Sequence, residues 1–210
     1  MSNRSSLASA NDIEADHALA QSLRDVRACT LCAADLPLGP RPVVRGQVGA
    51  RLLIISQAPG TRVHETGLSF NDRSGDRLRE WLGIDRATFY NEEKIAILPM
   101  GFCYPGRLPR GGDRPPSRAC APQWHDRMLA HWPRIDLTLL VGSYAIDYYL
   151  RESRRPTMTE TVADWRDFLP EFLPMPHPSW RTTGWERKNP WFGADLLPEV
   201  RRRVANLVTD

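Results

Sequence analysis

Four cysteines have the residue type and spacing that suit metal binding. Cys29 and Cys32 form a C-x2-C pair, and Cys103 and Cys120 form a second pair separated by 16 residues. Two thiolates three positions apart can bind one metal centre, and the distant pair would complete a set of four. Four thiolates suit either a zinc ion or an iron–sulfur cluster, so the spacing leaves both open, together with free or buried cysteines.

The segment between Cys103 and Cys120 is rich in proline, glycine and arginine, which predicts irregular structure. A metal bound by the flanking cysteines would explain how such a loop stays ordered, and the alternative is a solvated, mobile loop. In the ordered loop the arginine side chains would face outward and be available to phosphate groups. These arginines are Arg107, Arg110, Arg114 and Arg118.

A second group of residues with chemical potential follows an apolar run at 51–57. Pro59 and Gly60 predict a tight turn that exposes the backbone of Gln57 and Ala58. Phe70 lies in a polar, turn-prone stretch, where an aromatic ring suits stacking on a flat ligand better than packing in a core. The alternative is that Phe70 closes the end of the sheet.

Four β-rich runs must position these residues, and they cover 51–57, 94–100, 137–143 and 172–177. The first three are apolar at their centres, which is typical of strands covered on both faces. The fourth contains two prolines, which favours an edge strand. The intervening stretches can hold the crossover helices that parallel pairing requires. The pattern predicts an α/β fold, a three-layer α/β/α domain with a four-stranded, mainly parallel sheet.

Apolar residues at helical spacing predict five helices around this sheet. One should be capped by Ser117 and run to Trp132, another should be capped by Ser143, and a third should stop at Gly83. The first and last helices should bury the stripes Leu19, Leu23, Val26 and Leu197, Val200, Val204, Leu207.

The carboxyl ends of the predicted strands carry polar groups. They are Ser56 and Gln57, the segment 99–101, Ser143 and His177. Open parallel sheets bind their ligands beyond these ends, so we expect the functional site there.

The composition is that of one ordinary globular domain spanning residues 1–210, of which 1–12 are expected to be disordered. Apolar residues make up 41% and charged residues 25%, which excludes wholesale disorder. The sequence has no apolar run near 18 residues and no apolar leader, which predicts a cytoplasmic protein without a membrane partner. Of 28 basic residues only Lys94 and Lys188 are lysines, and the net charge of +3 permits a nucleic-acid partner. The arginine bias is equally explained by the codon usage of a GC-rich genome.

Taken in order, these motifs resemble those of the uracil-DNA glycosylase superfamily, specifically its iron–sulfur-containing families 4 and 5. The four-cysteine layout is similar to the [4Fe-4S] ligand set of those families. The segment SQAPG (56–60) resembles the first active-site motif, and HPSWR (177–181) resembles the second. The segment FNDRSGD (70–76) is close to the family 5 pattern, with one residue fewer between the aromatic residue and the aspartate.

The resemblance implies a structural [4Fe-4S] cluster on Cys29, Cys32, Cys103 and Cys120. It also implies that His177 donates a hydrogen bond to the departing base, which leaves as an anion. The residues expected around the base are Gln57, Ala58, His64, Phe70 and Met100. Those expected on the DNA are Arg73, Ser179 and Arg181, with Ser179 on a phosphate and Arg181 in the gap left by the flipped nucleotide.

Two positions depart from the superfamily pattern. Ala58 stands where family 1 has the aspartate that positions water, and the segment LPMG (98–101) lacks the uracil-reading asparagine of several branches. Base specificity therefore depends on backbone groups or on Gln57.

Another group must therefore activate the attacking water. Asp72, two residues after Phe70, is predicted to do so in preference to Asp76 or His64. The alternative for Asp72 is a cap on a helix that begins near Ser74, and the alternative for His64 is an exposed turn residue.

These features predict a monofunctional glycosylase that flips deoxyuridine out of DNA and hydrolyses its N-glycosidic bond. Neither active-site motif contains a lysine that could form a Schiff base, which disfavours a lyase. The alternatives are a glycosylase for other deaminated bases such as hypoxanthine, and a metal-stapled nucleic-acid-binding module without catalysis. We expect the protein to be a bacterial, cytoplasmic monomer that associates with the nucleoid while it acts on uracil-containing DNA.

Overall fold

Four parallel strands form the sheet of the computed structural model, which describes residues 10–209. They are β1 (Leu52–Ser56), β2 (Ile95–Pro99), β3 (Leu137–Val141) and β4 (Phe172–Met175). Their order is β2-β1-β3-β4, and every pair is parallel. The predicted α/β class is confirmed, and the proline-containing β4 lies at the sheet edge as predicted.

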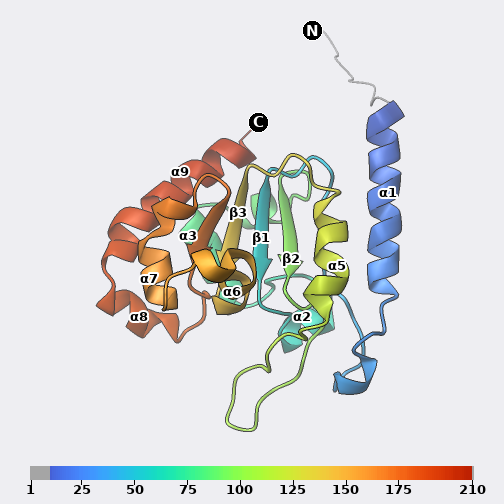
Figure 1. Cartoon of the computed structure of the whole chain (residues 1–210), viewed down its shortest axis with the longest axis horizontal. Helices are drawn as coiled ribbons and strands as arrows, with labels where there is room; N and C mark the ends of the chain where they lie inside the picture. Colours follow the sequence, from blue (N-terminus) through green and yellow to red (C-terminus); the bar gives the residue numbers. More distant parts are fainter. Residues whose placement is uncertain (1–9, 210) are drawn as a thin grey trace.

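Helices flank this sheet (Figure 1), with α6 in front of it and α3 behind it. Their bounds are α1 (Ala10–Arg27), α2 (Thr61–Thr66), α3 (Arg73–Leu82), α4 (Arg86–Phe89), α5 (Cys120–Leu129), α6 (Ser143–Leu150), α7 (Met158–Ala163), α8 (Thr182–Lys188) and α9 (Leu197–Val208). Within residues 10–209, none of the helices combines the length and the apolar character needed to span a membrane.

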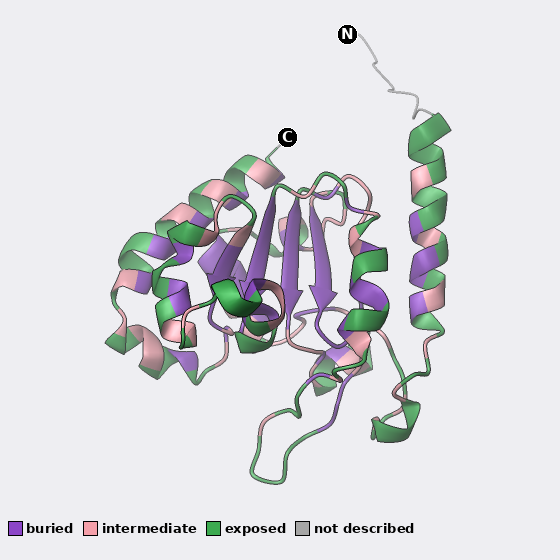
Figure 2. Cartoon of the chain, in the orientation of Figure 1, coloured by how far each residue is buried: buried purple, intermediate pink, exposed green. Residues whose placement is uncertain are grey.

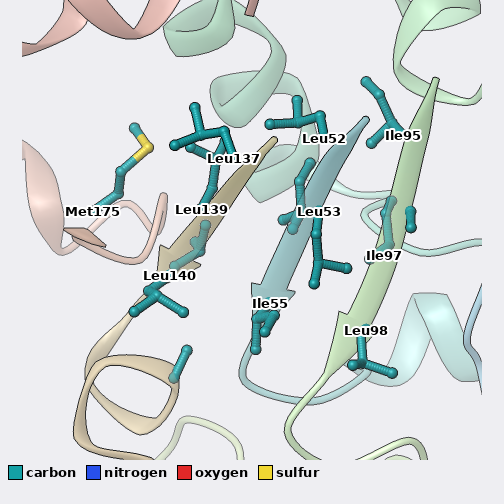
Figure 3. Packing of buried hydrophobic residues seen from close by; sticks show 14 of the residues in the cluster. Leu52, Leu53, Ile55, Ile95, Ile97, Leu98, Leu137, Leu139, Leu140 and Met175 are labelled. Atoms are coloured by element: carbon teal, nitrogen blue, oxygen red, sulfur yellow. The ribbon is translucent and has the colours of Figure 1, made fainter. Parts of the chain in front are cut away.

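The core lies on both faces of the sheet. All residues of β1, β2 and β3 are buried (Figure 2), and their aliphatic side chains interlock across neighbouring strands (Figure 3). The apolar stripes predicted for α1 and α9 are also buried, except for the partly exposed Leu207. A strand buried on both faces needs apolar residues at every position, which explains the continuous apolar runs of the sequence.

Helix α1 packs against α5 at the side of the sheet (Figure 1). It begins at Ala10, so residues 10–12, for which we expected disorder, form its first turn. The rest of that expected segment, residues 1–9, lies outside the described residues. The two predicted serine caps are wrong. Helix α5 begins three residues after Ser117 and ends before Trp132, and Ser143 is the first residue of α6 rather than its cap.

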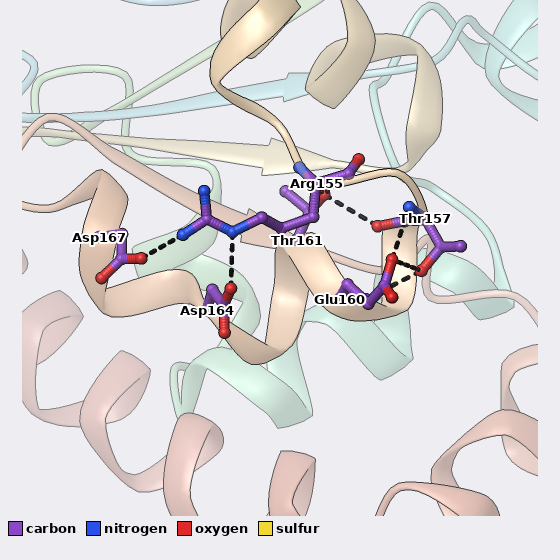
Figure 4. Close-up of polar contacts among 6 residues, drawn as sticks. All are labelled: Arg155, Thr157, Glu160, Thr161, Asp164 and Asp167. Atoms are coloured by element: carbon purple, nitrogen blue, oxygen red, sulfur yellow. Dashed lines mark hydrogen bonds and ion pairs between the residues drawn. The ribbon is translucent and has the colours of Figure 1, made fainter.

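The crossover from α6 to β4 is fixed by a capped helix and a branched ion pair (Figure 4). Thr157 caps α7 in a reciprocal capping box with Glu160. The guanidinium of Arg155 pairs with both Asp164 and Asp167 just beyond this helix. These contacts hold the chain that leads into β4 and thus to His177.

The carboxyl ends of the strands gather at one edge, where Figure 1 shows α2 and the long loop between β2 and α5. Ser56 at the end of β1 is level with Pro99 at the end of β2. Two further hydrogen bonds hold these ends together beyond the strands, from Met100 N to Ser56 O (2.7 Å) and from Gly101 N to Gln57 O (3.0 Å). This edge is where we expected the site.

Candidate active site

A small pocket of about 70 Å³ opens at the carboxyl ends of β1 and β2. Its wall consists of Ser56, Ala58, Pro59, Gly60, Val63, Ser69, Phe70, Asp72, Ser74, Pro99, Asp113 and His177. Four residues predicted for the site, namely Ala58, Phe70, Asp72 and His177, are therefore brought together from three separate segments.

Asp72 has two roles in this pocket. Its Oδ1 caps α3 by accepting hydrogen bonds from Gly75 N (3.0 Å) and Ser74 Oγ (2.5 Å). Its other carboxylate oxygen, Oδ2, lies toward Gly60, where a methyl group built on that glycine would lie 4.0 Å away. The capping role that we weighed as an alternative is thus present, and it leaves the second oxygen of the carboxylate at the pocket.

The turn that carries Asp72 is shaped by close backbone contact. A Cβ on Gly75 would lie 1.8 Å from the carbonyl oxygen of Phe70, so only glycine fits there. Phe70 itself has a positive φ of 55°, is 7% exposed, and contacts Phe89 edge-on at 5.9 Å between ring centroids. Phe70 therefore belongs to the core and also lines the pocket.

His177 follows β4 and is half-buried in the pocket wall. Its carbonyl oxygen accepts hydrogen bonds from Ser179 N (2.8 Å) and Thr182 Oγ1 (2.6 Å), which fix the turn of the His-Pro-Ser segment. Burial lowers the pKa of His177, while the negative charge of Asp72 acts in the opposite direction. A neutral imidazole carries one N–H, so His177 can donate one hydrogen bond to a ligand without adding a positive charge.

Three residues predicted to bind the base do not line this pocket. The Gln57 backbone is used in the contact with Gly101, and buried Met100 faces a neighbouring groove beside α5 and α6. His64 lies on α2, half-buried, with its ring centroid 6.1 Å from that of Tyr104. The Nδ1 atom of His64 is enclosed and has no hydrogen-bond partner within the described chain.

The residues predicted to contact DNA lie beside the pocket rather than in it. Arg73 and Arg181 are exposed, and Ser179 is half-buried, with its carbonyl oxygen bound by Arg77 Nη1 at 2.7 Å. The sequence reasoning missed Trp180, which is 79% exposed and is covered by the Arg181 guanidinium at 5.5 Å. An exposed tryptophan of this extent is unusual, and its place after the His-Pro-Ser segment was the available signal.

The loop between Cys103 and Cys120 is more regular than predicted. Arg107 and Asp113 form an antiparallel bridge, and Leu108 N donates to Gly112 O at 2.9 Å. Gly111 and Gly112 both have φ values of 88°, which allows the tight return of this short hairpin. The glycines that led us to expect irregular structure are the residues that make the turn.

The hairpin contributes a pocket residue that the sequence reasoning missed. Asp113 lines the pocket, on the same side of Gly60 as Asp72. Its only signal in the sequence is that it is the single carboxylate between Cys103 and Cys120. Partial burial raises the pKa of Asp113, Arg107 lowers it, and Asp72 raises it further.

All four cysteines line a second, larger cavity of about 250 Å³ on the far side of the hairpin base. They are unpaired by disulfides and come from three segments, after α1, after β2 and at the start of α5. Burial raises the pKa of Cys120 to about 12 and raises that of Cys103, with the other thiols contributing in the same direction. Among residues 10–209, no group of three or more His, Cys, Asp or Glu side chains is close enough to hold a single metal ion.

Residues 43–201 match the family model described as the uracil DNA glycosylase superfamily. The matched region includes every residue of the pocket wall, together with Cys103 and Cys120. Cys29 and Cys32 precede it.

Proposed function

The chain belongs to the uracil DNA glycosylase superfamily, and on that premise we propose that it is a monofunctional uracil-DNA glycosylase. The observation that carries this proposal is the convergence of His177, Asp72 and Phe70 on one pocket at the carboxyl ends of the strands. Each of these side chains has a task in removing a flipped base.

Hydrolysis of the glycosidic bond needs stabilisation of the negative charge on the base and of the positive charge on the sugar. The C1′–N bond breaks with its electron pair passing to the base, while positive charge develops on the sugar. The neutral His177 side chain donates a hydrogen bond to the base oxygen that becomes more negative, which favours the transition state over the ground state. The Asp72 carboxylate stabilises the developing cation and orients the attacking water.

One feature favours uracil as the base, and a second fits any deaminated base. The pocket is small, which favours a single pyrimidine ring over a two-ring purine. The neutral state of His177 suits a carbonyl oxygen, which every deaminated base presents. Pro99 keeps hypoxanthine as a second candidate, because this residue of the pocket wall offers no side-chain group to read a pyrimidine edge.

An excision assay tests this proposal directly. Purified protein is incubated with oligonucleotides that contain one deoxyuridine or one deoxyinosine, single-stranded or paired, and abasic sites are cleaved with alkali. We expect cleavage at deoxyuridine and its loss in His177→Ala. Cleavage at deoxyinosine alone would identify the protein as a hypoxanthine glycosylase. DNA binding without any cleavage would indicate a nucleic-acid-binding module without catalysis.

We also propose that the four cysteines hold a structural [4Fe-4S] cluster. The chemistry of four thiols around one cavity fits such a cluster, and about 250 Å³ is more space than one tetrahedral ion needs. The cluster would link the N-terminal helix to the hairpin, far from the reacting atoms.

The cofactor proposal predicts a brown protein with iron and sulfide in equal amounts. Metal analysis and the visible absorption spectrum of anaerobically purified protein measure this. A colourless protein with stoichiometric zinc would contradict the cluster, although the four cysteines would still be metal ligands.

A further inference from the structure

The carboxylate of Asp113 is the least explained group of the pocket. It makes no hydrogen bond or ion pair with any residue of the described chain. A methyl group built on Gly60 would lie 3.6 Å from Asp113 Oδ2 and 4.0 Å from Asp72 Oδ2, so both carboxylates border the same small space. Asp113 is an exposed residue that also lines the pocket, and the nearby negative charge of Asp72 disfavours the ionised form of its carboxyl group.

The hairpin is built to hold Asp113 in this position. The Arg107–Asp113 bridge fixes the backbone of Asp113. The next residue, Arg114, donates a backbone hydrogen bond from N to Gly106 O at 2.8 Å. At the tip, Gly112 lies against the Arg181 guanidinium, where a Cβ would be 3.3 Å from Nη1. The hairpin therefore spans from the cysteine cavity to the His-Pro-Ser turn, with Asp113 facing the pocket between them.

We infer that Asp113 is a second catalytic carboxylate, which accepts the proton of the attacking water; this inference rests on the proposed glycosylase function. The C1′–N bond breaks and its electron pair passes to the base, the water oxygen bonds to C1′, and the water proton passes to Asp113 and then to solvent. The departing base takes up a proton from solvent. The two carboxylates thus divide the work that an aspartate at position 58 would have performed.

The surroundings of the two carboxylates favour this division. Asp72 Oδ1 accepts two hydrogen bonds at the start of α3, which suits a fixed charge facing the sugar cation. Within residues 10–209 Asp113 has no such donors. The titratable groups near it are Arg107 on the hairpin and Asp72 and His177 on the pocket wall, while Arg181 lies against the preceding residue, Gly112. Its raised pKa makes Asp113 a better proton acceptor than an ordinary aspartate.

The test compares Asp113→Asn with the matched variant Asp76→Asn, whose carboxylate is exposed, paired with Arg79 and outside the pocket. Single-turnover excision from a deoxyuridine oligonucleotide is measured from mildly acidic to mildly alkaline pH, together with thermal unfolding. We expect Asp113→Asn to lower the rate by about 100-fold or more and to flatten the acidic limb of the pH profile. Asp76→Asn should keep both the rate and the limb.

The thermal readout separates catalysis from structure. Because the fold disfavours the charged form of Asp113, the asparagine variant should unfold at the same or a higher temperature at neutral pH. Asp113→Glu, which keeps the carboxylate, should recover part of the rate. A rate within about threefold of wild type with the acidic limb retained, or a clear loss of stability in Asp113→Asn, would overturn the inference. An inactive wild-type protein would instead contradict the proposed function.

Discussion

At the residue scale, Asp72 shows how one carboxylate can serve both folding and chemistry. One oxygen caps α3 through Gly75 N and Ser74 Oγ, and the other lies at the pocket. A residue fixed in this way keeps its orientation when the substrate arrives, because the cap holds its side-chain rotamer.

The two roles of Asp72 can be separated by a close isostere. Asparagine retains a side-chain oxygen that caps helices nearly as well as aspartate, so Asp72→Asn should fold and keep its melting temperature within a few degrees. It loses the negative charge, and we expect single-turnover excision to fall by about 100-fold or more. Unchanged excision in Asp72→Asn, with a collapse in Asp76→Asn or His64→Ala, would assign the charge to another residue.

Trp180 gives a second prediction at this scale. Its side chain is 79% exposed and contacts Arg181, so replacing it should leave the fold intact. We expect Trp180→Ala to slow excision more from paired DNA than from single strands, because only the duplex has a base stack to be held open. Arg181→Ala should show the same asymmetry. Rates on both substrates measure it, and an equal loss on both would indicate a phosphate contact instead.

At the scale of elements, a buried histidine supports the end of β2. His125 on α5 is fully buried, with Nδ1 at 2.5 Å from Tyr149 Oη and Nε2 at 3.0 Å from the Pro99 carbonyl oxygen. Its ring stacks on Phe102 at 5.7 Å between centroids. This contact joins α5 and α6 to the strand end that forms part of the pocket wall.

The buried His125 predicts how stability depends on pH. Burial lowers its pKa from 6.5 to about 4, so the folded chain favours the neutral ring. The unfolded chain takes up a proton as the pH falls below 6.5, so stability is complete above that pH and is lost toward pH 4, by up to about 3 kcal/mol. The half-buried His177, whose pKa is also lowered by desolvation, adds a loss in the same direction.

Urea unfolding of the wild type and of His125→Gln over this pH range measures the effect. The variant should be less stable at neutral pH, because a buried hydrogen bond is disturbed, and should lose less stability on acidification. Parallel pH curves for the two proteins would show that His125 is not the titrating group.

At the scale of the whole molecule, the four cysteines come from parts that are distant in sequence and line one cavity. Cys29 and Cys32 follow α1, Cys103 follows β2, and Cys120 begins α5. The hairpin that carries Asp113 lies between Cys103 and Cys120 in the sequence. The proposed cluster on these cysteines would therefore hold the N-terminal helix and one wall of the pocket together.

This arrangement predicts a global effect of losing one ligand. Metal binding is coupled to folding, so Cys103→Ser should lower the melting temperature and the iron content together. Ala28→Ser, an exposed change beside Cys29, is the matched control and should alter neither. If Cys103→Ser melts like the wild type and retains its iron, the cysteines do not stabilise the fold in this way.

The sequence by itself determined the sheet. Three short, continuous apolar runs are typical of strands covered on both faces, and two prolines favoured the edge for the fourth. It also determined the stop of α3, since Gly83 adopts the left-handed conformation that ends a helix. Before α5 the sequence was misleading, because Ser117 is the only residue of capping type there, yet the helix begins three residues later with Ala119 at the cap position.

Only the tertiary structure decided which residues form the pocket. Ala58 and His177 closely follow the ends of β1 and β4, so parallel topology predicted that they lie at the same edge of the sheet. Phe70 and Asp72 follow α2, and their motif, rather than the topology, pointed to the site. Gln57 and Met100 lie equally near strand ends and miss the pocket, because the backbone path just beyond a strand turns each side chain to one side or the other. Asp113 lies in a hairpin that is distant in sequence from the strand ends. The sequence pattern of a loop does not predict which part of the fold the loop contacts. Asp113 lies beside Asp72 because the glycine turn folds this loop into a hairpin that returns to the pocket, and that arrangement exists only in the folded chain.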